Sequence, residues 1–402
     1  MRMLAPLILP LFILARSSGA PDAAQAQAQV RAASPWTLAF HDEFDTLNLY
    51  DGKPGSGWRT EYGFGGEGSL GSRTLASSGE QEVYADPRFK GTAKTPLGLN
   101  PFELHDGVLS IVARKVDPAT SAQIWNRPYV SGLLTSKFLF TQQYGYFEFR
   151  ARLPRGKGLW PALWLVPKDN SWPPEIDVME GLGDPAVVYM TAHSKAAGMH
   201  TSDTQAVKIR ERPDDFHVFG LLWDRDQIVW YVDGAEAKRE VTPADMNRPM
   251  YILLNLAVGG SWPGYPESDF TSARMDIDYV RAWTLDPKAA SAPGAAAVPP
   301  PSFSGPQPSV VEMLPQAPPA PGQADAVSDR LTSLQAAVRA AMGSGVITRE
   351  QARSEFEALH QIALRHRTLK YGGKSGVSAA DMKDMGEQLD QIESRIGGRT
   401  GP

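Results

Sequence analysis

Residues 35–284 carry hydrophobic and polar positions in short alternating runs that predict β-strands. In TQQYGYFEFRARL, Phe147, Phe149 and Ala151 fall on one face, and Tyr146 and Glu148 fall on the other. Further strand-like runs follow, with turn residues such as Asp-Gly between them: FHVFGLLW, QIVWYVDG, YILLNLAVGG and ARMDIDYVRAW. No long helical period separates them, so the pattern favours an all-β antiparallel sandwich or barrel over alternating strands and helices.

The pattern changes after residue 284. Residues 285–325 are rich in proline, alanine and serine, which predicts a disordered linker that buries no core. Residues 326–397 then show helical spacing, with Leu331, Leu334 and Val338 on one side. Thr348 and Ser378 begin two further helical segments, the first of them with a capping-box pattern. We expect a small C-terminal helical extension outside the main domain.

The N-terminus predicts export. Residues 1–15 place an arginine before an apolar run that is too short to span a bilayer, as in a secretory signal peptide, and Ala26-Gln27-Ala28 suits cleavage. We expect residues 1–28 to be a signal peptide and the protein to be secreted, periplasmic or extracellular, with no membrane contact after cleavage. An uncleaved anchor or a buried helix is the alternative.

The composition of the chain excludes several kinds of site and partner. The 402 residues include no cysteine, which excludes disulfides, thiolate zinc sites and cysteine nucleophiles. The net charge of −5 provides no basic field for nucleic acid. The hydrophobic fraction of 42% is too high for a wholly disordered chain. We expect a monomer that has no nucleic-acid partner.

The segment SWPPEIDVMEGLGDP holds Glu175, Asp177 and Glu180 within six residues. On a regular strand Glu180 would point away from the other two, but a β-bulge near Val178-Met179 would return it to their face. Repulsion between such carboxylates raises at least one pKa, leaving an acid beside an ionised carboxylate. That division suits glycoside hydrolysis. A solvated strand end and a calcium site are the alternatives.

Several tryptophans lie near these acids. Trp160 and Trp164 precede the cluster in GLWPALWLVP, Trp172 directly precedes it, and Trp262 follows in GGSWPGYP. Indole faces stack on sugar rings, so we expect these four side chains to line a substrate cleft. Packing in the core is the alternative for each of them.

These residues resemble glycoside hydrolase family 16, in its laminarinase-like form with the bulged Glu-x-Asp-x-x-Glu signature EIDVME. Further similar motifs occur in family order over about 250 residues: HDEFD at 41–45, YGYFEFRARLP at 144–154, GLWPALWLVP at 158–167, DFHVFGLLW at 215–223, LNLAVGGSWPG at 254–264 and IDYVRAW at 277–283.

The resemblance implies a concanavalin A-like β-jelly-roll catalytic domain over residues 35–284, with a cleft across its concave sheet. It implies that Glu175 is the nucleophile, that Glu180 is the general acid/base and that Asp177 tunes the pair. His193 would border the acid/base, with a structural histidine as the alternative. No cofactor is expected for catalysis, but the resemblance implies a structural calcium ion at Asp278, helped by Glu43.

One stretch departs from the family. Where relatives carry Asn-Gly-Glu-x-Gln-x-Tyr, this chain has Ser78-Gly-Glu-Gln-Glu82-Val-Tyr84. Glu82 is expected to alter a sugar subsite or to pair with Arg73, which we assign to substrate binding. A solvated loop charge is the alternative for Arg73.

The expected function is a secreted retaining endo-β-glycanase that hydrolyses β-1,3 or mixed β-1,3-1,4 glucosidic bonds, with a polysaccharide as its partner. One alternative is an endo-glycanase of a bacterial exopolysaccharide or galactan. Another is a glucan-binding protein without catalysis, but the three intact carboxylates favour an enzyme. Transglycosylation uses the same two glutamates and stays open.

Overall fold

The computed structural model describes residues 36–285 except 197, 199, 211 and 213, residues 311–314, residues 326–362 except 349, 353, 357, 360 and 361, and residues 378–397. The signal peptide expected over 1–28 and most of the linker lie outside these ranges. No helix of the described residues is long and apolar enough to cross a membrane.

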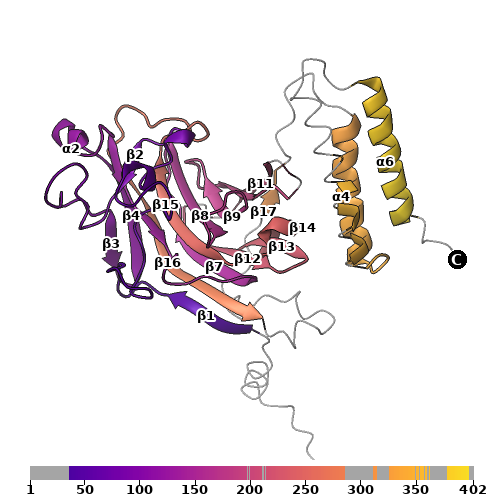
Figure 1. Ribbon diagram of the computed structural model, residues 1–402, viewed down its shortest axis with the longest axis horizontal. Helices are drawn as coiled ribbons and strands as arrows, with labels where there is room; N and C mark the ends of the chain where they lie inside the picture. The colour runs from indigo at the N-terminus through magenta and orange to yellow at the C-terminus, as the bar shows by residue number, and fades with distance from the viewer. Residues whose placement is uncertain are drawn as a thin grey trace, which may run out of the picture.

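Two antiparallel sheets form the described body of the chain (Figure 1). The larger has ten described strands, in the order β14 (Ala235–Val241), β13 (Gln227–Val232), β12 (His217–Trp223), β7 (Gly145–Arg152), β16 (Ser272–Leu285), β4 (Val108–Lys115), β5 (Tyr129–Ser131) and β2 (Glu82–Tyr84), with β1 (Trp36–Asp42) on β16 and β3 (Phe102–His105) on β4. Within it only the short β2–β5 pair is parallel among the described pairings.

The second sheet has seven described strands, in the order β17 (Val311–Met313), β11 (Thr201–Ile209), β10 (Val187–Ser194), β9 (Glu175–Gly181), β8 (Leu159–Pro167), β15 (Met250–Val258) and β6 (Leu133–Thr135). The predicted all-β jelly-roll sandwich with a C-terminal helical extension is confirmed. Short helices lie in the connections: α2 (Pro118–Gln123) and the 3₁₀ turns Leu70–Ser72, Ala76–Ser78 and Ala244–Met246.

The core lies between the sheets and follows the alternation of the sequence. Phe147 and Phe149 of β7 point inward, as do Leu163 and Leu165 of β8. The alternate residues of β8 point away from this core and line a cavity on the outer face of the second sheet. The strand period therefore determines which side chains reach the site.

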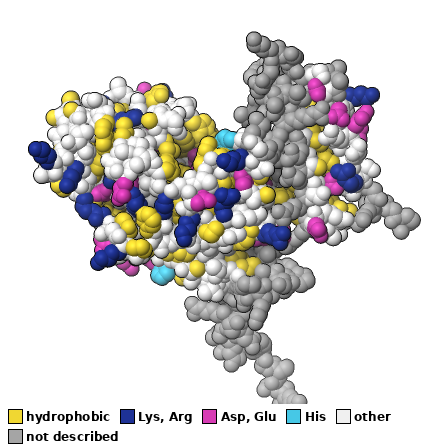
Figure 2. Space-filling view, in the orientation of Figure 1, with side chains coloured by type: hydrophobic (Ala, Val, Ile, Leu, Met, Phe, Trp, Pro, Cys, Tyr) yellow, Lys and Arg dark blue, Asp and Glu magenta, His cyan; other side chains and the backbone are white. Residues whose placement is uncertain are grey.

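Charged side chains are spread over the surface of the sandwich. Figure 2 shows basic and acidic side chains interspersed on the face in view. Many are paired, as in Arg155 with Asp214 at 2.8 Å and Lys157 with Glu267 at 2.9 Å. On this face, no patch of one sign dominates.

The helices α4 (Ala326–Gly343) and α6 (Ala379–Gly397) pack on each other through their own apolar cluster, which includes Leu331, Val338 and Leu389. Thr348 begins the helical stretch between them: its amide donates to Gln351 Oε1 at 2.8 Å, and the Gln351 amide donates to Thr348 Oγ1 at 3.2 Å. This is the capping box that the sequence predicts.

One part of the expected linker is ordered. Val311–Met313 forms β17 and pairs antiparallel with Val207–Ile209 of β11. The Leu314 amide donates to the Ala206 carbonyl at 3.0 Å. The prediction of disorder throughout 285–325 is therefore wrong at this segment, because its Val-Val-Glu-Met-Leu run meets an edge strand that has unpaired backbone groups.

Removing this strand is expected to lower stability. A chain that ends at residue 285 loses β17, whereas a chain that ends at residue 325 keeps it and lacks only the helices. Since the pairing contributes about 1 kcal/mol, we expect the shorter chain to melt about 2–4 °C below the longer one. Differential scanning calorimetry on both chains measures this, and equal melting temperatures would contradict a stabilising role for β17.

Candidate active site

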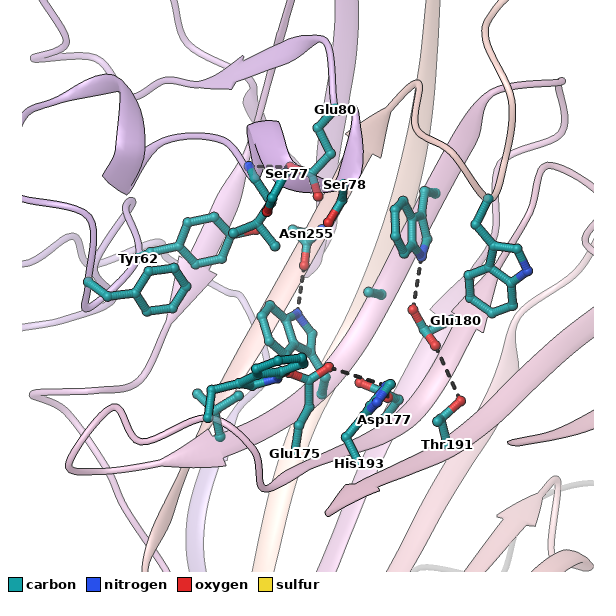
Figure 3. A pocket seen from close by; sticks show the side chains of 18 of the residues that line it. Tyr62, Ser77, Ser78, Glu80, Glu175, Asp177, Glu180, Thr191, His193 and Asn255 are labelled. Carbon is teal, nitrogen blue, oxygen red and sulfur yellow. Dashed lines mark hydrogen bonds and ion pairs between the residues drawn. The ribbon is translucent and has the colours of Figure 1, made fainter. Parts of the chain in front are cut away.

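A cavity of about 590 Å³ opens on the outer face of the second sheet, above β8, β9 and β10. Its lining includes Glu175, Asp177 and Glu180 of β9 together with Thr191 and His193 of β10 (Figure 3). The three carboxylates that the sequence singled out therefore meet on one face.

A β-bulge brings them together. Opposite β8, Leu163 pairs with Met179 and Trp164 pairs with Asp177, which leaves Val178 as an extra residue. Val178 and Met179 are both buried in the core, so Glu180 turns back to the face of Asp177. This is the bulge position that the sequence predicts.

The larger, ten-stranded sheet helps to hold this bulge. Trp230 of β13 donates its indole N–H across the core to the Asp177 carbonyl at 2.8 Å. A bulge disrupts the ladder of its own sheet, and this bond from the facing sheet satisfies one of the carbonyls involved. Trp230 is therefore a core residue, as its place in a strand-like run predicts, but one that contacts the backbone of the site.

Each glutamate accepts a hydrogen bond from a tryptophan of the site. Trp160 Nε1 donates to Glu180 Oε1 at 2.9 Å, and Trp172 Nε1 donates to Glu175 Oε2 at 2.7 Å. Thr191 Oγ1 lies 3.5 Å from Glu180 Oε2. Two of the four tryptophans assigned to the cleft thus orient the carboxylates while lining the cavity.

The other two tryptophans also line the cavity but differ in exposure. Trp262 is 41% exposed and packs edge-on against Trp160, with ring centroids 5.8 Å apart. Trp164 is only 7% exposed, and its indole N–H donates to Asn255 Oδ1 at 2.7 Å. Trp262 therefore offers an open ring face, whereas Trp164 forms part of the cavity floor.

Burial controls the protonation of the site. It raises the pKa of Glu180 to about 8, against the opposing Trp160 hydrogen bond and with the nearby Glu175 charge adding to the rise. Glu180 is therefore mostly protonated at neutral pH and available as an acid. Burial also raises the pKa of Glu175 well above its ordinary value, and Asp177 adds to this effect.

His193 adds a positive charge beside these acids. Its Nε2 lies 3.3 Å from Asp177 Oδ2 and 3.9 Å from Glu175 Oε1. Burial lowers the pKa of His193, but the hydrogen bond to Asp177 and the nearby carboxylates outweigh it and raise the pKa to about 9. A cationic His193 allows Glu175 and Asp177 to share one proton and to keep one negative charge at neutral pH.

The same side chains could in principle hold a cation. Glu175, Asp177 and His193 each offer one ligand atom within 4.8 Å of the others. However, Glu175 accepts from Trp172, and His193 Nδ1 lies 2.9 Å from His200 Nε2, in hydrogen-bonding distance. We interpret the group as a proton-sharing network because the imidazole Nε2 of His193 already faces Asp177 Oδ2 at 3.3 Å and Glu175 Oε1 at 3.9 Å.

Two expectations about charged residues are corrected. Arg73, assigned to substrate binding, lies outside the cavity lining and is 8% exposed, so it is not a solvated loop charge either. Its guanidinium donates to the Tyr84 carbonyl at 2.7 Å and to Asp86 at 3.2 Å, where it holds a loop. Glu82 does not pair with Arg73 and instead accepts from the Val258 amide at 2.7 Å.

The expected calcium ligands are engaged by arginines. Asp278 pairs with Arg150, and both Glu43 oxygens accept from Arg281 at 2.8–2.9 Å. The hydrogen bond from Arg281 lowers the pKa of Glu43. Both carboxylates therefore already have a cationic partner.

Sequence reasoning missed several residues of the cavity. Tyr62, Phe64 and Tyr251 add ring surface to it, and Glu80 and Asn255 add polar groups. Asn255 stands inside the matched motif LNLAVGG, and its alternation with the inward-facing Leu254 and Leu256 could have identified it. Tyr62, Phe64 and Glu80 lie in loops, where no periodic pattern of the sequence could have identified them.

The fold and site together define a class: a jelly-roll sandwich with an acidic cluster on a bulged strand in an aromatic-lined cleft, as in glycoside hydrolases. The family model for glycosyl hydrolases family 16 matches residues 106–281. A β-glucanase of Rhodothermus marinus is 32% identical over 62% of this chain and 85% of its own length. This chain belongs to family 16 of the glycosyl hydrolases.

Other relatives agree with this family. The endo-1,3-1,4-β-glycanase ExsH of Rhizobium meliloti (strain 1021) is 44% identical over 61% of this chain and 51% of its own length. The chain thus spans about half the length of that relative. The laminarinase catalytic domain of Thermotoga maritima MSB8 is 32% identical, with a TM-score of 0.50 over 62% of this chain and 98% of that domain.

The tryptophan donors are expected to control the pH profile. A hydrogen bond to a carboxylate favours its ionised form, so Trp160→Phe raises the pKa of Glu180 above about 8. The alkaline limb of kcat/KM, where the acid loses its proton, should move to higher pH. Trp172→Phe is the matched variant at Glu175 and should move the acid limb instead. If neither limb of the pH profile of kcat/KM moves in the two variants, these assignments are wrong.

Proposed function

We propose that this protein is an exported retaining endo-β-glucanase that hydrolyses internal β-1,3 or mixed β-1,3-1,4 glucosidic bonds. The observation that carries the proposal is the pairing of a protonated Glu180 with Glu175 on one face of an open, aromatic-lined cavity. Export rests on the leader pattern of residues 1–28. The names of the β-glucanase and endo-1,3-1,4-β-glycanase relatives support the substrate class.

The reaction proceeds in two displacements. Glu180 gives its proton to the glycosidic oxygen while Glu175 attacks the anomeric carbon, so that the bond to the leaving sugar breaks and a glycosyl ester forms. Glu180, now ionised, takes a proton from a water molecule that attacks the ester and releases Glu175. The cationic His193 and the shared proton at Asp177 stabilise Glu175 as it gains and loses negative charge.

Product analysis tests this proposal. The full chain is incubated with laminarin, lichenan, agarose, carrageenan and a bacterial exopolysaccharide, and the products are resolved by linkage and length. We expect mid-chain cleavage of laminarin and lichenan, with the β-anomer formed first in proton NMR spectra. Initial release of the α-anomer would overturn the retaining mechanism, and cleavage of only the galactans or the exopolysaccharide would overturn the substrate assignment.

A further inference from the structure

A buried acid, Glu80, lies on the wall of the cavity opposite Glu175, and a second acid, Glu82, lies close to it outside the cavity lining. Glu80 lines the cavity beside Ser77 and Ser78, as Figure 3 shows, and is 3% exposed. Glu82 begins β2 two residues later and is 0% exposed. Neither acid has a role in the mechanism proposed above.

No basic side chain of the described residues forms an ion pair with either acid. Glu80 Oε2 accepts from the Leu75 amide at 2.8 Å, and Glu82 Oε2 accepts from the Val258 amide at 2.7 Å. Arg127 is close, but its guanidinium donates to the Glu80 main-chain carbonyl at 2.6 Å. Two carboxylates that are buried without a counterion cannot both stay ionised at neutral pH.

One oxygen indicates where the proton lies. Glu82 Oε1 is buried, and no N–H or O–H of the described residues donates to it when both acids are ionised. A protonated Glu80 supplies the missing donor, and its side chain is in hydrogen-bonding contact with Glu82. An acid hydrogen-bonded to a carboxylate satisfies both groups and leaves one negative charge on the pair.

The surroundings favour this state. Burial raises the pKa of Glu80 well above its ordinary value, and the Glu82 charge adds to the rise. The tyrosines that face the pair, Tyr62 and Tyr84, have pKa values raised well above the usual range by burial, so they stay neutral. Arg127 is a nearby cation that acts on both acids, and it favours their ionised forms.

The pair also joins two segments of the cavity wall. Glu82 binds the Val258 amide at the end of β15, and the Gln81 amide donates to the Val258 carbonyl at 2.8 Å. The Ser261 amide donates to the Ser78 carbonyl at 2.8 Å, next to the exposed Trp262. Repulsion between two ionised acids would therefore separate the loop at 75–80 from the loop that carries Trp262.

We propose that Glu80 and Glu82 share one proton and act as a specificity-determining acid pair. In this state the pair closes the wall of the cavity and presents a hydrogen-bonding group to an uncharged sugar hydroxyl. The inference deepens the proposed glucanase function and rests on it for the substrate. Glu82 stands where the related pattern carries glutamine, so Glu82→Gln restores an amide donor to Glu80 and removes the second ionisation.

Binding of laminarihexaose tests the pair. The affinity is measured by isothermal titration calorimetry from pH 6 to pH 10, in full-length Glu175→Gln and in the double variant Glu175→Gln/Glu82→Gln, neither of which is expected to turn over. Ionisation of Glu180 and His193 affects both proteins equally. We expect an additional loss of about tenfold in affinity at alkaline pH in the single variant only. Equal pH dependence in the two proteins would overturn the inference.

Thermal melting separates this inference from the proposed function. A carboxyl whose pKa is raised by folding stabilises the folded protein at low pH. This stabilisation is lost as the pH rises from the ordinary pKa of the group through its raised pKa. The melting temperature of the wild-type chain should therefore fall more steeply with pH than that of Glu82→Gln. The exposed Glu67→Gln is the matched control and should behave as wild type. Identical curves would overturn the shared proton even if no glucan binds, whereas failure of wild type to cleave glucans affects only the function.

Discussion

Glu175→Gln is expected to abolish glucan hydrolysis while glucan binding persists. The amide keeps the shape of the side chain and can still accept from Trp172, but it lacks the charge needed to attack the anomeric carbon. We expect kcat on laminarin to fall by about 10⁴-fold or more, as is typical when a nucleophile is removed. Reducing-sugar release measures turnover, and calorimetry with laminarihexaose measures binding.

The exposed Glu67→Gln serves as the control for this variant and should leave turnover unchanged. If Glu175→Gln hydrolysed laminarin at the wild-type rate, the assignment of Glu175 as nucleophile would be wrong. If it lost binding and folding together, the amide would have broken the network with Asp177 and His193, and Glu175→Ser would then have to test the chemistry alone.

Glu180→Ala is expected to lose activity in a way that depends on the leaving group. Polysaccharide cleavage requires the acid and should fall by about 10²–10⁴-fold. An aryl β-glycoside with an acidic phenol needs no proton, so its first step should be preserved and the glycosyl ester should accumulate. Azide attacks that ester without a general base, and we expect it to restore turnover and yield a β-glycosyl azide.

The configuration of the azide product gives the second half of this test. A β-azide from Glu180→Ala identifies Glu180 as acid/base and Glu175 as the group that formed the ester. Azide should have no such effect on Glu175→Gln, which forms no ester. An α-azide from Glu180→Ala, or a lack of azide rescue in that variant, would contradict the roles given to the two glutamates.

Local periodicity was sufficient to predict the framework of the site. The alternation in β7 separated Phe147 and Phe149, which face the core, from Tyr146 and Glu148. The spacing of Glu175, Asp177 and Glu180 required an extra residue near Val178-Met179. These features depend on a few neighbouring residues of one strand. Strand geometry alone therefore determines them, and sequence is enough to find them.

Partners that come from distant parts of the chain could not be predicted in this way. The Glu82 carboxylate binds the amide of Val258, which lies 176 residues away, and Asp278 pairs with Arg150, 128 residues before it. The pKa of Glu180 depends on burial by several strands, which spacing does not reveal. Likewise, β17 could not be found within a proline-rich segment, since it needs the open edge of β11.

The bond from Trp230 to the Asp177 carbonyl has a consequence for engineering. It spans the two layers of the sandwich, so the position of the catalytic strand depends on how the interior of the protein is filled. Substitutions that repack this interior to increase heat resistance would shift the indole and, with it, the bulge that aims Glu180. Thermostability and turnover are thus coupled through a residue that never contacts sugar, and directed evolution for one trait should select compensating changes around Trp230 for the other.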